Sequence, residues 1–281
     1  MEDYLGEEAA NVYTKNPKFP PHIAEYVMNR LKKIKGNENF EKFELVVDAG
    51  CGNGKSLLDF LPFFQRSIGF DVNENQVRRA KESIKSETAT FYVGIEESML
   101  VEDKSVDLLL NVGALHFMDL ATFLKECRRV LKSTGLCATY DSSFSRLEVH
   151  FPVKNANQKT ADGSGILTSY RTTLYRYYIE ANHPTAEWLN RYEQIYERVT
   201  GFNKERNDDV TYDYNMTLKE LKMFFLSFPT FRKHHNLFGE ESAPLNIMGE
   251  DLKKLVNAEG IDDEKLQLRF TLSMFFLFLY N

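Results

Sequence analysis

The fold of this chain is decided by the stretch VVDAGCGNGKS, Val46 to Ser56. It completes an apolar run that begins at Glu44, which is typical of a strand buried on both faces of a sheet. Glycines at positions 50, 52 and 54 let the backbone turn sharply and approach a ligand at the N-terminus of a helix. We therefore expect a buried strand, a glycine loop and a helix over residues 52–61 that together form a ligand site.

Strands and helices alternate after this loop as far as Asp141. Further strands are expected at residues 67–73, 89–94, 105–113 and 136–141, and further helices at 74–85 and 120–132. A helix over 21–35 precedes the loop, since its apolar residues recur on one face and Gly36 can end it. This alternation predicts a parallel sheet with helices on both faces.

The alternation stops after Asp141. Residues 145–235 are polar and aromatic, with helices expected near 185–200 and 218–228. Residues 266–280 have the apolar composition of a long strand. We expect a helical insertion or lid on the substrate side, followed by a strand that closes the sheet.

The composition excludes several classes of protein. The 281 residues are 43% hydrophobic and 27% charged, which is ordinary for a globular chain with one sizeable core. The formal net charge of −6 argues against a nucleic-acid partner. The last apolar run, from Leu272 to Tyr280, is too short to span a membrane, and the acidic start lacks the order of a signal peptide. Three scattered cysteines are too few for a disulfide framework or a zinc site. We expect a cytoplasmic monomer or homodimer with no metal and no membrane partner.

Three kinds of ligand use such a glycine loop. A P-loop for a nucleoside triphosphate requires glycine at position 49, where alanine stands, and Asp48 would repel the phosphates. A dinucleotide loop requires its third glycine one residue later than Gly54. S-adenosylmethionine has no phosphates and carries a partly cationic amino-acid end, so Asp48 favours it. Asp71, at the tip of the second strand, is placed to accept hydrogen bonds from both ribose hydroxyls. The two acids together favour S-adenosylmethionine, with a P-loop-like nucleotide-binding protein as the outside alternative.

The glycine loop, DAGCGNG at 48–54, resembles motif I of the class I S-adenosylmethionine-dependent methyltransferases. Other segments resemble that family in the same order along the chain, namely GFD at 69–71, VGIEESM at 93–99, DLLLNVGALHFMD at 107–119 and ECRRVLKSTG at 126–135. Outside this core, residues 11–27 and 214–231 are similar to the trans-aconitate methyltransferase-like branch. We therefore expect one S-adenosylmethionine-dependent methyltransferase domain that releases S-adenosyl-L-homocysteine.

The resemblance implies a doubly wound, Rossmann-like α/β fold with a seven-stranded, mostly parallel sheet. The last strand would be antiparallel, helices would cover both faces, and a helical insertion would follow the fifth strand. The single domain would span 1–281, with a cover helix at 1–36, a cofactor-binding core at 40–142, the insertion at 145–235 and the closing strand at 266–280.

The resemblance also implies a set of cofactor contacts. They are expected at Tyr13, Asp48, Gly50, Gly52, Asp71, Val72, Ile95, Glu96, Asn111 and Val112. Ile95 stands where the family often has an aspartate, so recognition of the adenine would depend on backbone groups and packing.

The sequence of the turn after the fourth strand excludes several classes of methyl acceptor. Amino-methylating nucleic-acid enzymes carry [DNS]-P-P-[YFW] there, whereas residues 111–114 read Asn-Val-Gly-Ala. The glutamate pair of the protein arginine methyltransferases is also absent from 112–118. A small-molecule acceptor is the remaining class. The resemblance to the trans-aconitate methyltransferase-like branch implies that the methyl group goes to a carboxylate or another oxygen of that molecule. A methyltransferase-like module that binds but has lost turnover is the main alternative.

Four residues are candidates for the acceptor site. His116 and Phe117 follow the fourth strand, at the sheet edge where doubly wound folds bind ligands. His116 could orient or deprotonate the acceptor, or it could simply pack in the pocket wall. Arg171 and Tyr175 lie in the insertion, where the arginine could bind a substrate carboxylate.

Overall fold

The computed structural model describes residues 19–36, 42–95, 98–155, 158–239 and 243–281. The chain divides into two compact units. The first comprises Met1–Asp141, Tyr192–Asn207 and Phe275–Asn281, and the second comprises Ser142–Arg191 and Asp208–Met274. Two long strands, β5 (Leu131–Asn155) and β9 (Gln267–Tyr280), contribute residues to both units.

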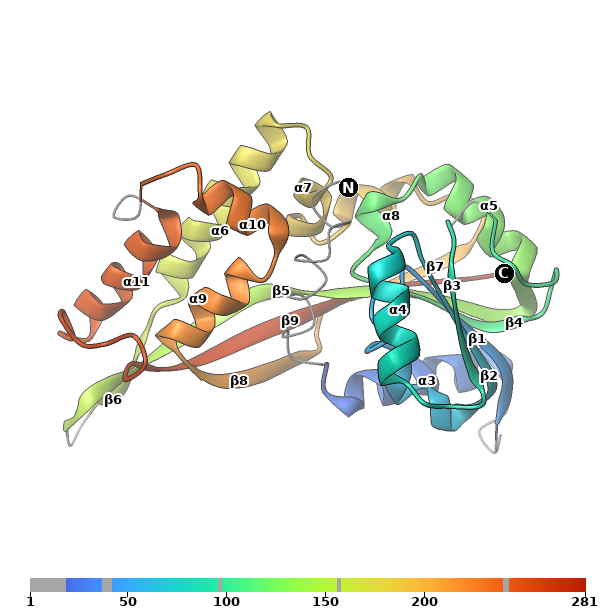
Figure 1. The fold of residues 1–281 in the computed structure, drawn as a ribbon, viewed down its shortest axis with the longest axis horizontal. Coiled ribbons are helices and arrows are strands. Elements are labelled where there is room, and N and C mark those ends of the chain that lie inside the picture. Colours follow the sequence, from blue (N-terminus) through green and yellow to red (C-terminus); the bar gives the residue numbers. More distant parts are fainter. Residues whose placement is uncertain (1–18, 37–41, 96–97, 156–157, 240–242) are drawn as a thin grey trace. The chain divides into compact units, whose positions relative to one another are not determined.

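The first unit is built on a mostly parallel sheet (Figure 1). Besides β5 and β9 it contains β1 (Phe43–Ala49), β2 (Phe64–Asp71), β3 (Ala89–Val93), β4 (Val106–Val112) and β7 (Asn203–Asn207). Their order is β3-β2-β1-β4-β5-β9-β7; the pairs among β1 to β5 are parallel, and β7 is antiparallel to β9. The order reverses between β1 and β4, which is the switch point where doubly wound folds bind their ligands.

The central strands are buried because their sequences are continuous apolar runs. Leu45, Val46 and Val47 of β1 are at most 3% exposed, and the middle of β4 is fully buried. Strands covered on both faces require such runs rather than an alternating pattern. The strands expected from these runs are confirmed.

Helices cover the sheet of the first unit. They include α3 (Pro21–Lys35), α4 (Glu74–Ser83), α5 (Leu120–Val130) and α8 (Glu193–Arg198), and in Figure 1 α3 and α5 flank β1 and β4 from opposite sides. Capping residues in the sequence determine where these helices begin and end. Asn73 caps α4 by accepting from two backbone amides, Asp119 caps α5, and Gly36 ends α3 in the left-handed region at φ 64°.

The helix expected over 52–61 is wrong. Two short 3-10 turns, Leu57–Asp59 and Leu61–Phe63, occupy its place. Pro62 supplies no amide hydrogen and disfavours helical backbone at the residue before it. The chain then enters β2 at Phe64, directly after the second turn.

The second unit contains helices and additional strands. Its helices are α6 (Ser164–Glu180), α7 (Thr185–Leu189), α9 (Leu218–Leu226), α10 (Pro229–His235) and α11 (Pro244–Leu255), and its strands include β6 (Gln158–Asp162) and β8 (Thr211–Thr217). Aromatic rings fill its core: Phe144 packs edge-to-face against Trp188 and Phe225. Thr217 and Glu220 form the capping box that begins α9.

Two features differ from the sequence-based expectation. Within the described residues the sheet has nine strands rather than seven, because the extended parts of β5 and β9 pair with β6 and β8. The helix expected near 185–200 is divided into α7 and α8, since Arg191 and Tyr192 both have left-handed backbone and turn the chain between them. The roles assigned to residues 1–36, 40–142, 145–235 and 266–280 stay predictions.

Candidate cofactor site

A cavity opens in the first unit at the carboxyl ends of the parallel strands. It is lined by the start of α3, the glycine loop, the end of β2, the segment after β3, the turn after β4 and Tyr140 at the end of the parallel part of β5. All of these lie at the switch point of the sheet order, where two neighbouring loops diverge and leave room for a ligand.

The glycine loop can form only with glycines. Gly50, Gly52 and Gly54 have φ of 79°, 53° and 79°, a region that side-chain-bearing residues rarely adopt. A Cβ on Gly50 would lie 2.5 Å from the Cβ of Ala114, and one on Gly54 would lie 2.5 Å from Ile84. The amides of Gly50 and Cys51 both donate to the carbonyl of Phe70 at 2.8 Å, so the loop is held against the end of β2.

Asp71 both binds the backbone of the glycine loop and lines the cavity. Its carboxylate accepts from the amides of Gly52 and Asn73, each at 2.8 Å, and the residue lines the cavity. Burial raises the pKa of Asp71, and the two amide hydrogen bonds oppose that rise. Each carboxylate oxygen has a second lone pair, so Asp71 can also accept from two hydroxyls of a ligand.

Asp48 lies at the end of β1 and is fully buried. Its Oδ2 accepts from the Ser56 hydroxyl at 2.6 Å, while its Oδ1 is buried without a hydrogen-bond partner. Burial raises the pKa of Asp48 to about 7, and the charge of Asp71 adds to the rise. A buried oxygen without a donor is costly, so this position suits a ligand that brings a cation or a donor.

Asn111 supports the loop from β4. It is fully buried, its Nδ2 donates to the carbonyl of Ala49 at 2.8 Å, and its Oδ1 has no hydrogen-bond partner. Asp48 and Asn111 are therefore placed beneath the loop and are not among the residues that line the cavity.

The remaining predicted site residues fall into three groups. Gly50, Gly52, Asp71, Val72, Ile95, Val112 and Phe117 line the cavity. Tyr13 and Glu96 lie outside the described residues. Arg171 and Tyr175 are on α6 in the second unit, where Arg171 donates to Ser143 and to the carbonyl of Phe144.

His116 lies in the short turn after β4 and is oriented by its neighbours. Its Nδ1 is 2.7 Å from the hydroxyl of Tyr192, and its ring packs on Phe117 with 4.0 Å between ring centroids. Tyr192 is fully buried and has a left-handed backbone, with φ of 56°. A buried tyrosine held in a strained conformation fixes the imidazole in one direction.

Sequence reasoning missed several cavity residues. Tyr140 is buried, lines the cavity and packs edge-on against Phe19. Gln76, in the first turn of α4, lines the cavity and has a buried Oε1 without a hydrogen-bond partner. The polar residue at the end of a parallel strand was a usable signal for Tyr140, whereas nothing in the sequence distinguishes Gln76 from other helix residues.

Comparison with known proteins identifies the domain that contains much of the cavity lining. Residues 47–139 match a family described as a methyltransferase domain, and they contain the glycine loop, Asp71 and the turn after β4. This part of the chain is a class I S-adenosylmethionine-dependent methyltransferase domain. A methyltransferase of Bacillus subtilis, YcgJ, is described as uncharacterized and is 34% identical over 94 residues, which cover 32% of this chain and 37% of that protein.

Other relatives match the same domain. CRG1 of Saccharomyces cerevisiae, described as a probable S-adenosylmethionine-dependent methyltransferase, is 26% identical over 140 residues, which cover 47% of this chain and 44% of that protein. The chain thus spans less than half the length of these curated relatives. A solved structure from Anaeromyxobacter dehalogenans, provisionally named a type II methyltransferase, has a TM-score of 0.64 with 17% identity, and covers 93% of this chain and 97% of its own. The two proteins share the fold of the methyltransferase family, while the trans-aconitate branch stays a prediction.

The residues of the cavity fit S-adenosylmethionine, the methyl donor of this family. Asp71 retains acceptor capacity for a ribose diol, and beneath the glycine loop the buried carboxylate of Asp48, whose Oδ1 has no hydrogen-bond partner, would attract the cofactor's ammonium. Among the described residues, no group of three or more His, Cys, Asp and Glu could hold a metal ion. In the same part of the chain, no helix is long and apolar enough to cross a membrane.

Proposed function

We propose that this protein transfers the methyl group of S-adenosylmethionine to an oxygen of a small molecule, with a carboxylate as the first candidate. The observation that carries the proposal is the cavity at the switch point, in which Asp71 both closes the glycine loop and faces the ligand space. A cytoplasmic monomer or homodimer remains our expectation for its state.

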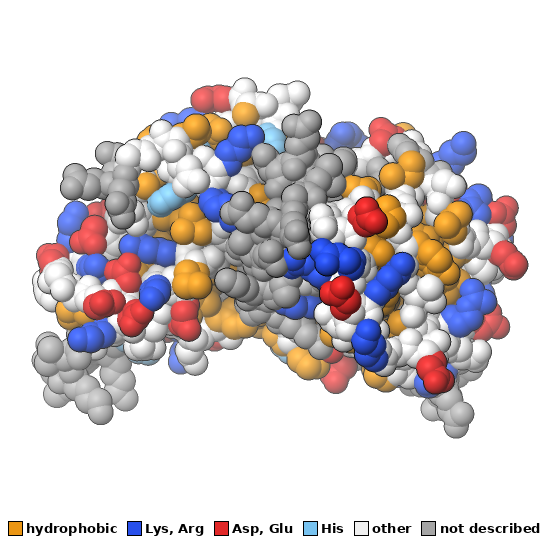
Figure 2. All heavy atoms as spheres, viewed as in Figure 1, with side chains coloured by type: hydrophobic (Ala, Val, Ile, Leu, Met, Phe, Trp, Pro, Cys, Tyr) orange, Lys and Arg blue, Asp and Glu red, His pale blue; other side chains and the backbone are white. Residues whose placement is uncertain are grey.

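The proposed acceptor is small because of the charges and the turn sequence. The net charge is −6, and on the face drawn in Figure 2 Lys and Arg side chains are interspersed with Asp and Glu. Such a surface offers little to a long phosphate backbone. The turn after β4 also lacks the proline pair of amino-methylating nucleic-acid enzymes.

The chain's own contribution to the reaction is mainly alignment. The cofactor supplies an electrophilic methyl group on a sulfonium, and attack must come in line with the breaking bond. In our proposal Asp71 holds the ribose, Asp48 attracts the ammonium, and Ile95 with Met99 packs against the base. Holding both reactants in one geometry removes the entropic cost of bringing them together.

His116 is the proposed orienting residue for the acceptor. A carboxylate is already anionic and needs no base, so His116 would align it by a hydrogen bond rather than remove a proton. Tyr192 would keep the imidazole in the required direction through the 2.7 Å contact between its hydroxyl and Nδ1.

We expect Tyr192→Phe to lower kcat/KM for the acceptor by about threefold to tenfold, because one hydrogen bond that fixes His116 is lost while the ring is kept. Steady-state kinetics with both substrates varied measures the effect, and KM for S-adenosylmethionine should not change. Tyr196→Phe is the matched control, since that hydroxyl donates to the carbonyl of Lys204 instead. Equal kinetics for Tyr192→Phe and wild type would contradict the role of Tyr192.

We expect the affinity for S-adenosylhomocysteine to rise about tenfold between pH 6 and pH 8, because attraction of the ammonium needs ionised Asp48 and the pKa of Asp48 is about 7. Without cofactor, the free energy of unfolding contributed by protonated Asp48 should fall as pH rises from about 3.8 to about 7. In this window the folded protein still holds a proton that the unfolded chain, with an ordinary pKa of 3.8, has released. Calorimetric titrations across this pH range test the first effect, and Asp48→Asn should make the affinity independent of pH. A pH-independent affinity in the wild type would argue against the ammonium contact.

A turnover screen tests the proposed reaction. Methyl-labelled S-adenosylmethionine would be incubated with the protein and with small carboxylic acids, phenols and amines, and labelled products would be separated. Labelled esters above the rate without protein would support the proposal. Cofactor binding without any turnover would favour a methyltransferase-like binding module, and labelled amines alone would contradict an oxygen acceptor.

A further inference from the structure

We propose that Arg129 and Glu126 of α5 are positioning residues for the cofactor, because together they hold the segment after β3 in the conformation that places Met99 in the cavity wall. This inference rests on the proposed function, since it assigns the cavity to S-adenosylmethionine. Neither side chain lines the cavity itself.

The segment between β3 and β4 has no regular structure of its own. Among its described residues, 94–95 and 98–105, none is in a helix or strand. Within it, the amide of Val101 donates to the carbonyl of Met99 at 2.7 Å, but further backbone groups of the segment take partners from elsewhere in the fold. Gly94 begins the segment by donating its amide to the carbonyl of Asp71 at 3.1 Å, so the segment starts directly beside the proposed ribose site.

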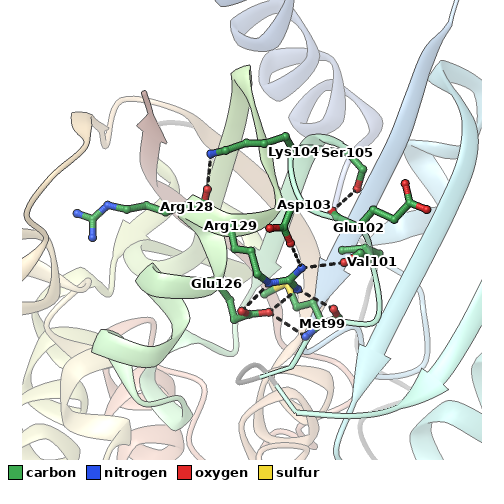
Figure 3. A network of polar contacts seen from close by, with 9 residues as sticks. All are labelled: Met99, Val101, Glu102, Asp103, Lys104, Ser105, Glu126, Arg128 and Arg129. Atoms are coloured by element: carbon green, nitrogen blue, oxygen red, sulfur yellow. Dashed lines mark hydrogen bonds and ion pairs between the residues drawn. The ribbon is translucent and has the colours of Figure 1, made fainter.

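Side chains of α5 provide those partners (Figure 3). Arg129 donates to the carbonyl of Met99 at 2.8 Å and to the carbonyl of Val101 at 2.9 Å. Glu126 accepts from the amide of Met99 at 3.1 Å. Both backbone polar groups of Met99 are thus bound by one ion pair on a neighbouring helix.

The guanidinium of Arg129 uses all five of its N–H donors in this arrangement. Besides the two carbonyls, it donates twice to Glu126, at 2.8 and 2.7 Å, and once to Asp103 at 2.7 Å. Only arginine offers five donors in a planar fork, so lysine cannot reproduce the set. The bidentate pair with Glu126 also prevents rotation of the guanidinium, because two parallel bonds fix its plane.

The segment matters to the cofactor through its side chains. Met99 is 3% exposed and lines the cavity together with Ile95. With Ile95 in place of an acid, an apolar ring beside the ribose would be held by packing, which depends on where these two side chains lie. A shift of the Met99 backbone would therefore change cofactor affinity without touching the reacting atoms.

Arg128, the residue before Arg129 on α5, serves as the control position. It donates to the carbonyl of Thr200 at 2.7 Å, and its guanidinium lies over the ring of Phe202. Its side chain leaves the helix in another direction in Figure 3. Arg128→Ala thus removes an equal charge together with one hydrogen bond and one ring contact, neither of which is to the segment after β3.

The test compares Arg129→Ala, Arg129→Lys and Arg128→Ala with wild type. We expect Arg129→Ala to raise KM for S-adenosylmethionine and Kd for S-adenosylhomocysteine by about tenfold or more, with kcat at saturation within about twofold. Arg129→Lys keeps the charge with fewer donors. Its KM for S-adenosylmethionine and Kd for S-adenosylhomocysteine should lie between those of wild type and Arg129→Ala. Arg128→Ala should leave both constants unchanged even if it lowers Tm.

Two outcomes would overturn the inference. One is unchanged cofactor affinity in Arg129→Ala, and the other is an equal loss in Arg128→Ala at a similar loss of Tm. If Arg129→Ala does not fold, the lysine variant gives the decisive comparison of KM with kcat.

Hydrogen exchange separates this inference from the proposed function. In protein without cofactor, the amides of Met99 to Asp103 should exchange faster in Arg129→Ala than in Arg128→Ala, because the carbonyls of Met99 and Val101 lose the arginine that holds this stretch of backbone in place. Faster exchange without any cofactor binding by the wild type would overturn the proposed function and the positioning role together, while leaving the hold of α5 on the segment established. Unchanged exchange in Arg129→Ala would show that Arg129 does not hold the backbone of this segment in place.

Discussion

Replacing Asp71 with alanine should weaken binding of S-adenosylhomocysteine by about a hundredfold or more. The variant loses two hydrogen bonds from ribose hydroxyls to a charged acceptor, each contributing about 1.5 kcal/mol or more. Two such losses correspond to about a hundredfold in affinity. The amides of Gly52 and Asn73 also lose their acceptor, so the glycine loop itself becomes less ordered.

Calorimetric titration measures this effect, and two variants control for it. Asp71→Asn keeps one side-chain oxygen and should bind with an intermediate loss. Glu74→Ala removes a nearby exposed acid at the start of α4 and should bind as the wild type does. An Asp71→Ala protein that binds within about threefold of wild type would show that Asp71 does not hold the ribose.

Replacing Gly50 with alanine should remove measurable cofactor binding and destabilise the first unit. The new Cβ would lie 2.5 Å from Ala114 and 3.1 Å from Met118, and the residue would be forced to keep φ near 79°. Left-handed backbone costs a side-chain-bearing residue about 1–2 kcal/mol, and overpacking adds about 1–3 kcal/mol. Relief of the clash would push the glycine loop or the turn after β4 away from the cavity that both line.

Gly36→Ala separates the effect of left-handed backbone strain from the effect of the steric clash. Gly36 also has a left-handed φ, of 64°, but nothing lies within 4 Å of the Cβ that would be added there. We expect it to show the modest loss of stability due to backbone strain, with wild-type binding. Thermal unfolding and titration of both variants give the comparison. Equal binding by Gly50→Ala and Gly36→Ala would contradict the close approach of the loop to the turn after β4.

Much of the first unit could be predicted from the sequence because its signals are local. Continuous apolar runs predicted β1, β2 and β4, and an acid at the end of a parallel strand predicted the place of Asp71 in the cavity. The helix after the glycine loop was wrongly predicted, since the prediction took no account of Pro62, and Leu57 and Phe60 lie in a stretch of 3-10 turns. Those two side chains are indeed buried, but from 3-10 turns.

The features that could not be predicted from the sequence depend on contacts between distant parts of the chain. The lengths of β5 and β9 follow from pairing with β6 and β8, which lie in sequences too polar to be recognised as strands. Glu126 and Arg129 stand in a recognisable motif at the end of α5. Their binding to the backbone of Met99, however, follows only from the way α5 packs beside that segment.

The central claim, that the cavity binds S-adenosylmethionine, is tested most directly by calorimetric titration of the wild-type protein with S-adenosylhomocysteine and, separately, with ATP and magnesium. We predict binding of S-adenosylhomocysteine at one site per chain and no binding of ATP, because Asp48 and Asp71 at the loop would repel a triphosphate. Binding of ATP with no binding of S-adenosylhomocysteine would contradict the account and assign the glycine loop to a nucleotide.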